Sequence, residues 1–344
     1  MNSKQESRYQ SFRIDFDASS GSIRYLYPRS NVMDVYTTEA TFQIELAETI
    51  DPLGKNPNVP HIYKKISDFG SKNQIISRLI IELDEFTKLL PKSLQPLIRD
   101  DWSQAKDRLI HCQQIEQSIN KKIAAINNQL SAHSNIQNPV FNLPQINNLK
   151  IDSDTFLQEA KLYLQNLSEI YNKLFNTDFT GPHFHKIAED LEKKYGKTDE
   201  LYEFVANNEK YFISIIVNWR NAIEHPSKHK MLHVKNFSLS VDNKISFPSW
   251  IFNNETPIYI HEQMTAFVEG LLEFGEIFYI LCTQQKTKTL IAKLNIYLYL
   301  NLLIHRYNKK RERDLTTIYG VGCHSIPLFS NISVYSLSCQ GWGW

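Results

Sequence analysis

The segment LYEFVANNEKYFISIIVNWRNAIEHP, residues 201–226, decides how most of this chain folds. Apolar side chains recur along it at the spacing of an amphipathic helix, so they share one face. Thr198, just before it, is a candidate N-cap with Glu200 in the first turn. Pro226 must end the helix near His225, because proline disfavours the helical conformation of the residue before it. The segment therefore predicts one long bundle helix. The apolar positions of its face are Leu201, Phe204, Phe212, Ile215, Ile216, Trp219 and Ile223.

Helical spacing also occurs on both sides of this segment. One stripe begins at Ile76 and is stopped by Pro91, and a second, longer stripe ends in an Asn/Gln/Pro-rich linker over 133–148. A third begins after two capping candidates, Asp152 and Ser153. These three stripes predict long antiparallel helices. With a short helix and a last bundle helix added, the expected helices outside the opening segment lie at about 76–90, 105–130, 156–174, 184–195 and 256–282.

Strand-like sequence precedes the helical part. Three stretches within residues 11–48, SFRIDFDA, SIRYLYP and TFQIELAE, alternate roughly with period two, and a proline-rich loop at 51–60 closes the region. Two more stretches, HVKNFSLSV and KISFPSW, flank Asp242 and Asn243 and predict a β-hairpin before the last helix. The predicted fold class is mainly α, an antiparallel helical bundle with a small strand-rich N-terminal region and this hairpin.

The same patterns divide the chain into three parts. We expect a strand-rich region at 1–65, the helical bundle at 66–285, and a C-terminal part at 286–344. Within that last part, residues 286–313 carry eight Lys and Arg against one acid, whereas 315–344 carry none of the four charged residue types, so a basic helix is expected before an uncharged tail.

Composition limits the class of protein. Of the 344 residues, 42% are hydrophobic and 22% charged, which excludes collagen-like, coiled-coil-only and wholly disordered chains. The formal net charge of +1 gives no chain-wide basic field, so a nucleic-acid partner needs a local patch. Four scattered cysteines and a polar N-terminus favour a reducing cytoplasm. Polar residues interrupt the apolar stretch 290–305, so no membrane partner is expected.

The chemistry-bearing residues stand at the end of the 201–226 segment. Arg220 and His225 are five residues apart and diverge by about 140° on a helix. Because Pro226 ends the helix, the imidazole can swing around the terminus towards the flank that carries Arg220. An arginine can hold the non-bridging oxygens of a phosphodiester by a forked contact, and a histidine moves protons near neutral pH. The pair predicts a phosphodiester site.

RNAIEH at 220–225 resembles the R-N-x-x-x-H signature of the HEPN superfamily, helical domains found in many bacterial toxins and antiviral defence proteins. The resemblance covers roughly 70–283 and places the signature at the end of a bundle helix. It implies a metal-independent endoribonuclease that acts as a homodimer, with two signatures facing each other. It also implies attack by the ribose 2′-OH, leaving a 2′,3′-cyclic phosphate, with no cofactor.

Carried over residue by residue, the resemblance makes Arg220, Asn221 and His225 the catalytic set, with Asn221 orienting Arg220 or the phosphate. Glu224 has no assigned role. Some toxins of the family carry a tyrosine, modified by a partner antitoxin, where this chain has Ser227. An antitoxin or defence-system partner protein is therefore compatible with the resemblance, but that mode of regulation is not supported.

Residues outside the signature also carry side chains that suit binding chemistry. Lys228, His229 and Lys230 follow the signature and are expected either to contact RNA phosphates or to form a solvated approach to the hairpin. His183 and His185 lack the spacing and the extra ligands of a metal site, so they are interpreted as helix-entry residues. No phosphate-binding loop or serine-hydrolase turn occurs, and no metal ligand set is predicted.

Two other function classes stay open. One is a catalytically silent HEPN-like module that binds nucleotide or RNA or serves in dimerisation. The other is a helical protein-interaction domain in which the motif is incidental. An intact set of Arg220, Asn221 and His225 favours the enzyme.

Overall fold

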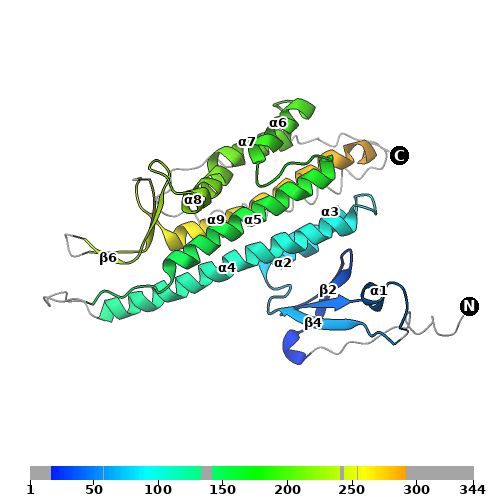
Figure 1. Cartoon of the computed structure of the whole chain (residues 1–344), viewed down its shortest axis with the longest axis horizontal. Helices are drawn as coiled ribbons and strands as arrows, with labels where there is room; N and C mark the ends of the chain where they lie inside the picture. Colours follow the sequence, from blue (N-terminus) through cyan, green and yellow to red (C-terminus); the bar gives the residue numbers. More distant parts are fainter. Residues whose placement is uncertain (1–16, 57, 133–141, 241–243, 254, 292–344) are drawn as a thin grey trace, which may run out of the picture. The chain divides into compact units, whose positions relative to one another are not determined.

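The computed structural model describes residues 17–56, 58–132, 142–240, 244–253 and 255–291 (Figure 1). Its contacts divide the chain into one unit that ends at Lys288 and a second from Thr289. Nearly all of the second unit, including most of the expected basic helix and the uncharged tail, lies outside the described residues. The division at residues 65 and 285 that composition indicates stays a prediction.

Four antiparallel strands form a sheet in the order β1-β2-β3-β4 after the 3₁₀ turn η2 (Ala18–Ser20). A short helix, α1 (Ala47–Ile50), lies between the third and fourth strands. Val35, Ala40, Phe42 and Ile44 form a buried apolar cluster in this sheet. The strands are β1 (Ile23–Pro28), β2 (Val32–Thr37), β3 (Thr41–Glu45) and β4 (Ile62–Ser67).

Two of these strands confirm the sequence analysis, namely those within SIRYLYP and TFQIELAE. The third expected strand, within SFRIDFDA, lies mostly outside the described residues. The sequence does not indicate β2 or β4. In β2 a fully buried Asp34 breaks the apolar pattern, and its charge is matched by Arg29 at 3.2 Å. In β4 residues 62–66 are all exposed, so no face is marked as apolar.

Polar side chains join the sheet to the helices. The carboxylate of Asp84 accepts a hydrogen bond from the Tyr25 hydroxyl of β1 at 2.6 Å. It also forms an ion pair with Arg99 at 2.6 Å, and both charged side chains are buried. A buried ion pair of this kind is costly to break from one side only, so Asp84 holds β1 against the helical part.

Three long helices form the centre of the bundle, and Figure 1 shows them running alongside one another. They are α4 (Gln95–Ala132), α5 (Leu149–Phe175) and α9 (Ile260–Ile291). Two ion pairs, Arg108 with Glu159 and Asp101 with Lys173, show that α4 and α5 are antiparallel, as expected, because the residue numbers rise along one helix as they fall along the other. The Tyr163 hydroxyl of α5 donates to the carbonyl of Leu271 on α9 at 3.0 Å.

The remaining helices correct several expected boundaries. The stripe at 76–90 is three short pieces, α2 (Gln74–Ile76), the π-helical η3 (Ser77–Glu82) and α3 (Asp84–Thr87), and not one long helix.

Two expected caps are also wrong. Helix α5 starts at Leu149 behind Asn148, whose positive φ of 62° suits asparagine, so Asp152 and Ser153 lie inside the first turns. Asp199, not Thr198, caps the next helix, because its carboxylate accepts hydrogen bonds from two backbone amides. The short helix α6 (Phe184–Tyr195), ending at Gly196, is as predicted.

The helix expected from Thr198 to His225 is interrupted by a π-helical turn. It consists of α7 (Glu200–Asn208), η4 (Glu209–Ile213) and α8 (Ser214–Glu224). Eight residues separate Phe204 from Phe212, which at 100° per residue would rotate Phe212 by about 80° from the stripe. The π-helical turn η4 lies in that interval and changes the rotation per residue there. After it, Ile216 and Trp219 of α8 are buried.

The hairpin before the last helix is confirmed. Strand β5 (Leu232–Lys235) pairs with β8 (Ser249–Phe252), and β6 (Ser238–Leu239) pairs with β7 (Ile245–Ser246). Helix α9 begins at Ile260 and not at Thr256, because residues 258–259 form β9 (Ile258–Tyr259) against β8.

The structure therefore confirms a mainly helical fold with a strand-rich N-terminal region and a hairpin before the last long helix. Among the helices that it describes, none combines the length and apolarity that crossing a membrane requires. The apolar stretch 290–305 lies mostly outside the described residues.

Candidate functional site

The signature lies at the C-terminal end of α8. The helix ends at Glu224, and His225 leaves the helical conformation with φ of −131° and ψ of 68° while its amide still donates to the Asn221 carbonyl at 2.8 Å. One residue before Arg220, the buried Trp219 packs edge-on against Trp250 of β8. This end of the helix is therefore fixed by the hairpin, and the side chains after Trp219 start from a defined backbone.

Arg220 is held from two sides. Its Nε donates to Oε1 of Gln158 on α5 in a short hydrogen bond, and its Nη1 lies 3.5 Å from Oε2 of Glu224. The side chain is only 15% exposed. The guanidinium is thus positioned by α5 and by the last turn of α8 together.

Asn221 contacts a lysine and not Arg220. Its Oδ1 accepts a hydrogen bond from Nζ of Lys161 on α5 at 3.0 Å. The same ammonium lies 3.5 Å from Oε2 of Glu224. Glu224, to which the sequence assigns no role, therefore faces two cations. The charge of Arg220 lowers the pKa of the Glu224 carboxyl most, and the charge of Lys161 lowers it further.

His225 is exposed at the helix end. The positive charge of its protonated form also contributes to the lowering of the pKa of Glu224. The structure thus brings Arg220, Asn221 and Glu224 of α8 together with Gln158 and Lys161 of α5. The approach of His225 to Arg220 that the sequence suggests has no counterpart in the described contacts of Arg220.

The basic residues after the signature form a tight turn. Ser227 and Lys230 exchange two backbone hydrogen bonds of 3.0 and 3.1 Å, which leaves Lys228 and His229 exposed at the tip. Lys230 turns back to α8, where its Nζ donates to Oδ1 of Asn218 at 3.0 Å. Lys228 and His229 are therefore the more accessible of the three expected RNA contacts.

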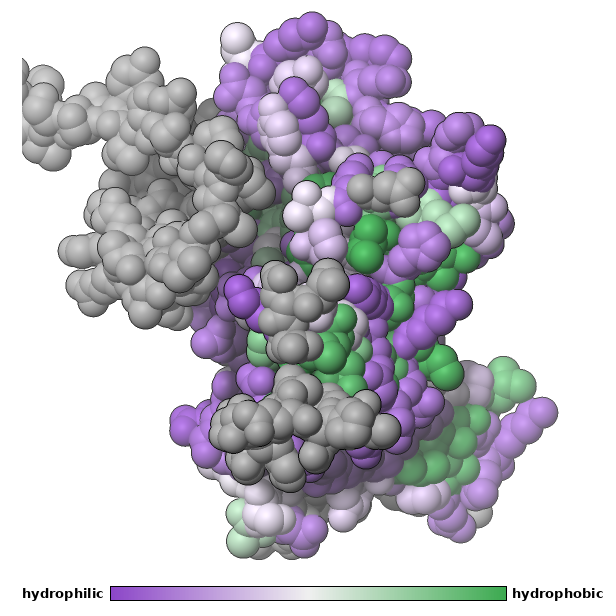
Figure 2. Space-filling model, turned by 90° about the vertical axis from the view of Figure 1, so that its left-hand side faces the viewer, coloured by the Kyte–Doolittle hydropathy of each residue, from purple (hydrophilic) through white to green (hydrophobic). Residues whose placement is uncertain are grey.

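Figure 2 faces the end of the molecule that carries β6, and hydrophilic residues form most of the described surface there, interrupted by separate hydrophobic spots.

His183 and His185 stand at the entry of α6, as interpreted from the sequence. His183 is its N-cap residue, and the two rings lie 5.4 Å apart. Burial lowers the pKa of His183, and the charges of Lys186, His185 and Lys161 add to this effect. No group of three or more His, Cys, Asp or Glu in the described part of the chain could hold a metal ion.

Sequence reasoning missed Gln158 and Lys161. With Asp154 they form a polar row on α5 at steps of four and three residues, next to the buried Leu157 and Ala160. A polar row beside the apolar stripe of a core helix is the signal that could have marked them, although it does not say which helix they face.

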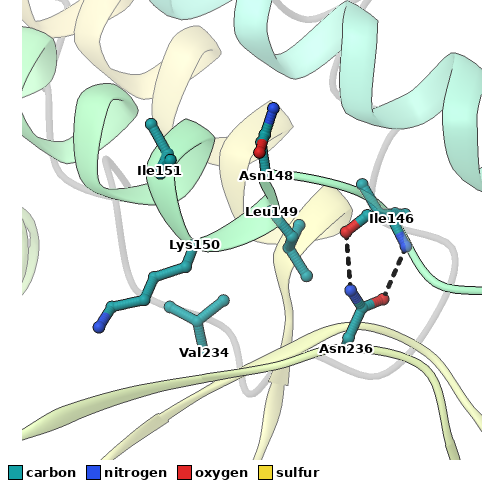
Figure 3. Close-up of a pocket in the computed structure, with 7 residues that line it drawn as sticks. All are labelled: Ile146, Asn148, Leu149, Lys150, Ile151, Val234 and Asn236. Atoms are coloured by element: carbon teal, nitrogen blue, oxygen red, sulfur yellow. Dashed lines mark hydrogen bonds between the residues drawn. The ribbon is translucent and has the colours of Figure 1, made fainter.

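A separate pocket of about 320 Å³ lies where α5 begins beside β5. Figure 3 shows Asn236 joined by two hydrogen bonds to the backbone of Ile146, so its amide is already used. Ile151 and Val234 supply apolar lining, and Lys150 is its charged residue. The pocket holds none of the signature residues, and we assign no ligand to it.

Comparisons of the chain with protein-family models, with curated proteins and with solved structures found no match in any of the three.

Proposed function

We propose that this protein is a metal-independent endoribonuclease of the HEPN type. The observation that carries the proposal is the arrangement at the end of α8. A largely buried, doubly held Arg220 lies five residues before an exposed His225 whose backbone has left the helix. A fixed cation and an accessible proton carrier are two of the parts that cleavage of a phosphodiester uses.

The proposed reaction needs no redox partner and no external nucleophile. A base takes the proton from the ribose 2′-OH, and the O2′ atom forms a bond to phosphorus. The bond from phosphorus to O5′ breaks, and an acid protonates O5′. The products are a 2′,3′-cyclic phosphate and a 5′-OH end. Arg220 stabilises the negative charge that grows on the non-bridging oxygens.

Two protomers complete the proposed site. Each chain supplies one His225, whereas the reaction uses one base and one acid. A two-fold dimer in which the ends of two α8 helices meet provides both groups, through the same surface on each protomer. RNA is the proposed partner, and Lys228, His229 and Lys230 are the proposed contacts to phosphates beside the cleaved bond.

In the cell, we propose a cytoplasmic toxin or antiviral defence effector, with an antitoxin or defence-system protein as a further partner. The reducing environment is supported by Cys112 and Cys282, which are buried and free.

The testing experiment incubates purified full-length protein with RNA in excess EDTA. We expect wild type to cut the RNA, products with cyclic phosphate ends, and no cleavage by His225→Ala. His111→Ala, a histidine change on α4, serves as the matched control and should cut like wild type. Loss of wild-type cleavage in EDTA that Mg²⁺ restores would contradict the mechanism, as would full activity of folded His225→Ala.

A second candidate is the catalytically silent binding module. The contacts of Arg220 with Gln158 and Glu224 favour it, because a guanidinium held in this way is less available to a transition state. The silent module predicts that RNA binds and stays intact in the same experiment.

A further inference from the structure

Two cations converge on one carboxylate oxygen beside the signature. Nζ of Lys161 and Nη1 of Arg220 each lie 3.5 Å from the same atom, Oε2 of Glu224. The two cations come from different helices, α5 and α8, and Gln158 and Asn221 fix their positions by hydrogen bonds. The geometry is that of an anion site with two donors and one anion.

The anion is the outermost of the three groups. The side chains of Lys161 and Arg220 are 23% and 15% exposed, whereas that of Glu224 is 40% exposed. Two neighbouring cations of low exposure need a counter-charge. Asp154 supplies only part of it, because burial raises the pKa of Asp154, and the charges of Lys150 and then of Arg220 oppose this rise without overcoming it. The carboxylate of Glu224, the most exposed of the three side chains, supplies the remaining counter-charge to Lys161 and Arg220.

The position of Glu224 in the structure is not a strongly stabilising one for a carboxylate. Glu224 stands in the last turn of α8, where the partial negative charge of the helix end disfavours an acidic side chain. Its two ion pairs are long and partly exposed, so each is weak. A phosphodiester offers two charged non-bridging oxygens to the same donors and can form shorter, charge-assisted bonds.

We propose that Lys161 and Arg220 form the phosphate-binding pair of the site, and that Glu224 occupies this pair until an RNA phosphodiester displaces it. Lys161 thus becomes a substrate-binding residue contributed by α5, and Glu224 an internal competitor. The choice of RNA as the ligand rests on the proposed function, whereas the convergence of Lys161 and Arg220 on Glu224 is independent of it.

The experiment measures binding and not cleavage. A fluorescent single-stranded RNA whose riboses are all 2′-O-methylated cannot be cut by 2′-OH attack, so its anisotropy reports affinity of the full-length protein alone. Glu224→Gln should bind it about two- to fivefold tighter, since a weak competing ion pair is removed. Lys161→Gln should bind about tenfold more weakly, and Lys161→Arg should restore most of the affinity.

Matched controls carry the same change of charge elsewhere. Glu203→Gln on α7 and Lys121→Gln on α4 alter exposed residues and should leave affinity unchanged. The dependence of affinity on salt adds a second readout, because loss of one phosphate contact should reduce the slope by about 0.7 for a single strand. Inorganic phosphate, titrated against the bound RNA, should compete more effectively in Glu224→Gln than in wild type.

The outcomes separate this inference from the proposed function. Wild-type affinity in both Glu224→Gln and Lys161→Gln, with melts that show folded protein, would overturn the inference even if natural RNA is cut. The expected shifts with natural RNA left intact would support the phosphate pair and reject the nuclease. Failure of the wild type to bind the methylated RNA would overturn the inference, and natural RNA left intact as well would reject the nuclease.

Discussion

Trp219 and Trp250 pack edge to face with their ring centroids 5.4 Å apart, and this contact joins the hairpin to α8 one residue before Arg220. Trp250 is fully buried and also faces Phe156 of α5 and Phe267 of α9. One indole therefore links the hairpin to three helices of the bundle. The position of the signature depends on this packing as much as on α8 itself.

Trp250→Ala should destabilise the protein by about 3–5 kcal/mol, because it leaves a large cavity among aromatic rings. Trp250→Phe should cost much less, since most of the volume is kept. Thermal melts followed by circular dichroism measure both. At a temperature where Trp250→Ala is still folded, cleavage should also fall, because Arg220 loses its fixed starting point. Equal melting temperatures for the two variants would contradict this account of the hairpin.

Arg220→Ala should weaken RNA binding and slow cleavage, whereas His225→Ala should slow cleavage by about 10²–10⁴-fold with little loss of binding. Arg220→Lys should rescue little, because an ammonium cannot make a forked contact with Gln158 on one side and an oxyanion on the other. Single-turnover cleavage and anisotropy binding, run on the same preparations, check this. A His225→Ala protein that has lost binding but cuts normally once saturated with RNA would contradict the assigned roles.

The end of α8 and the hairpin could be predicted because each carries a local signal. Pro226 stops the helix, and the two strand-like stretches flank a turn. The sequence indicates the π turn η4 only indirectly. The stripe has no apolar member between Phe204 and Phe212, and eight positions of regular α-helix would not return Phe212 to the face of Phe204. Strand β2 was hidden by Asp34, whose buried charge is balanced by Arg29, a residue that no local pattern connects with it.

The candidate site could be predicted only on the helix that carries the motif. Arg220, Asn221 and His225 are found from their spacing, whereas Gln158 and Lys161 lie about 60 residues earlier and reach the motif through packing of α5 on α8. The role of Glu224 also depends on this packing, because one of its two cations belongs to α5. Periodicity assigns polar residues to a face, but tertiary contacts decide what that face meets.

The proposed dimer places the ends of two α8 helices together, so a new charge on the same segment should separate the protomers. Ser227, two residues after His225, is exposed, and Ser227→Glu would bring two like charges towards the two-fold axis. Light scattering at micromolar concentration should show a dimer for wild type and a monomer with reduced cleavage for Ser227→Glu. Leu53→Glu, an exposed change in the N-terminal region, is the control. A wild-type protein that is strictly monomeric and still cuts RNA would exclude a site shared between protomers.

Asp101 makes the stability of the helical bundle depend on pH. Its carboxylate pairs with Lys173 at 2.6 Å, yet burial raises its pKa from 3.8 to about 6 against the opposing effect of that lysine. The folded state therefore binds the proton more tightly than the unfolded chain does. This contribution to stability is fully present below pH 4 and is lost as the pH rises through about 6. Relative to Asp101→Asn, which stays neutral, wild type should lose roughly 1–3 kcal/mol between these pH values. Urea unfolding of both proteins at a series of pH values measures the difference, which cancels the titration of other carboxyl groups. A difference that stays constant with pH, or that grows in favour of wild type as the pH rises, would show that the ion pair with Lys173 outweighs the cost of burying the carboxylate.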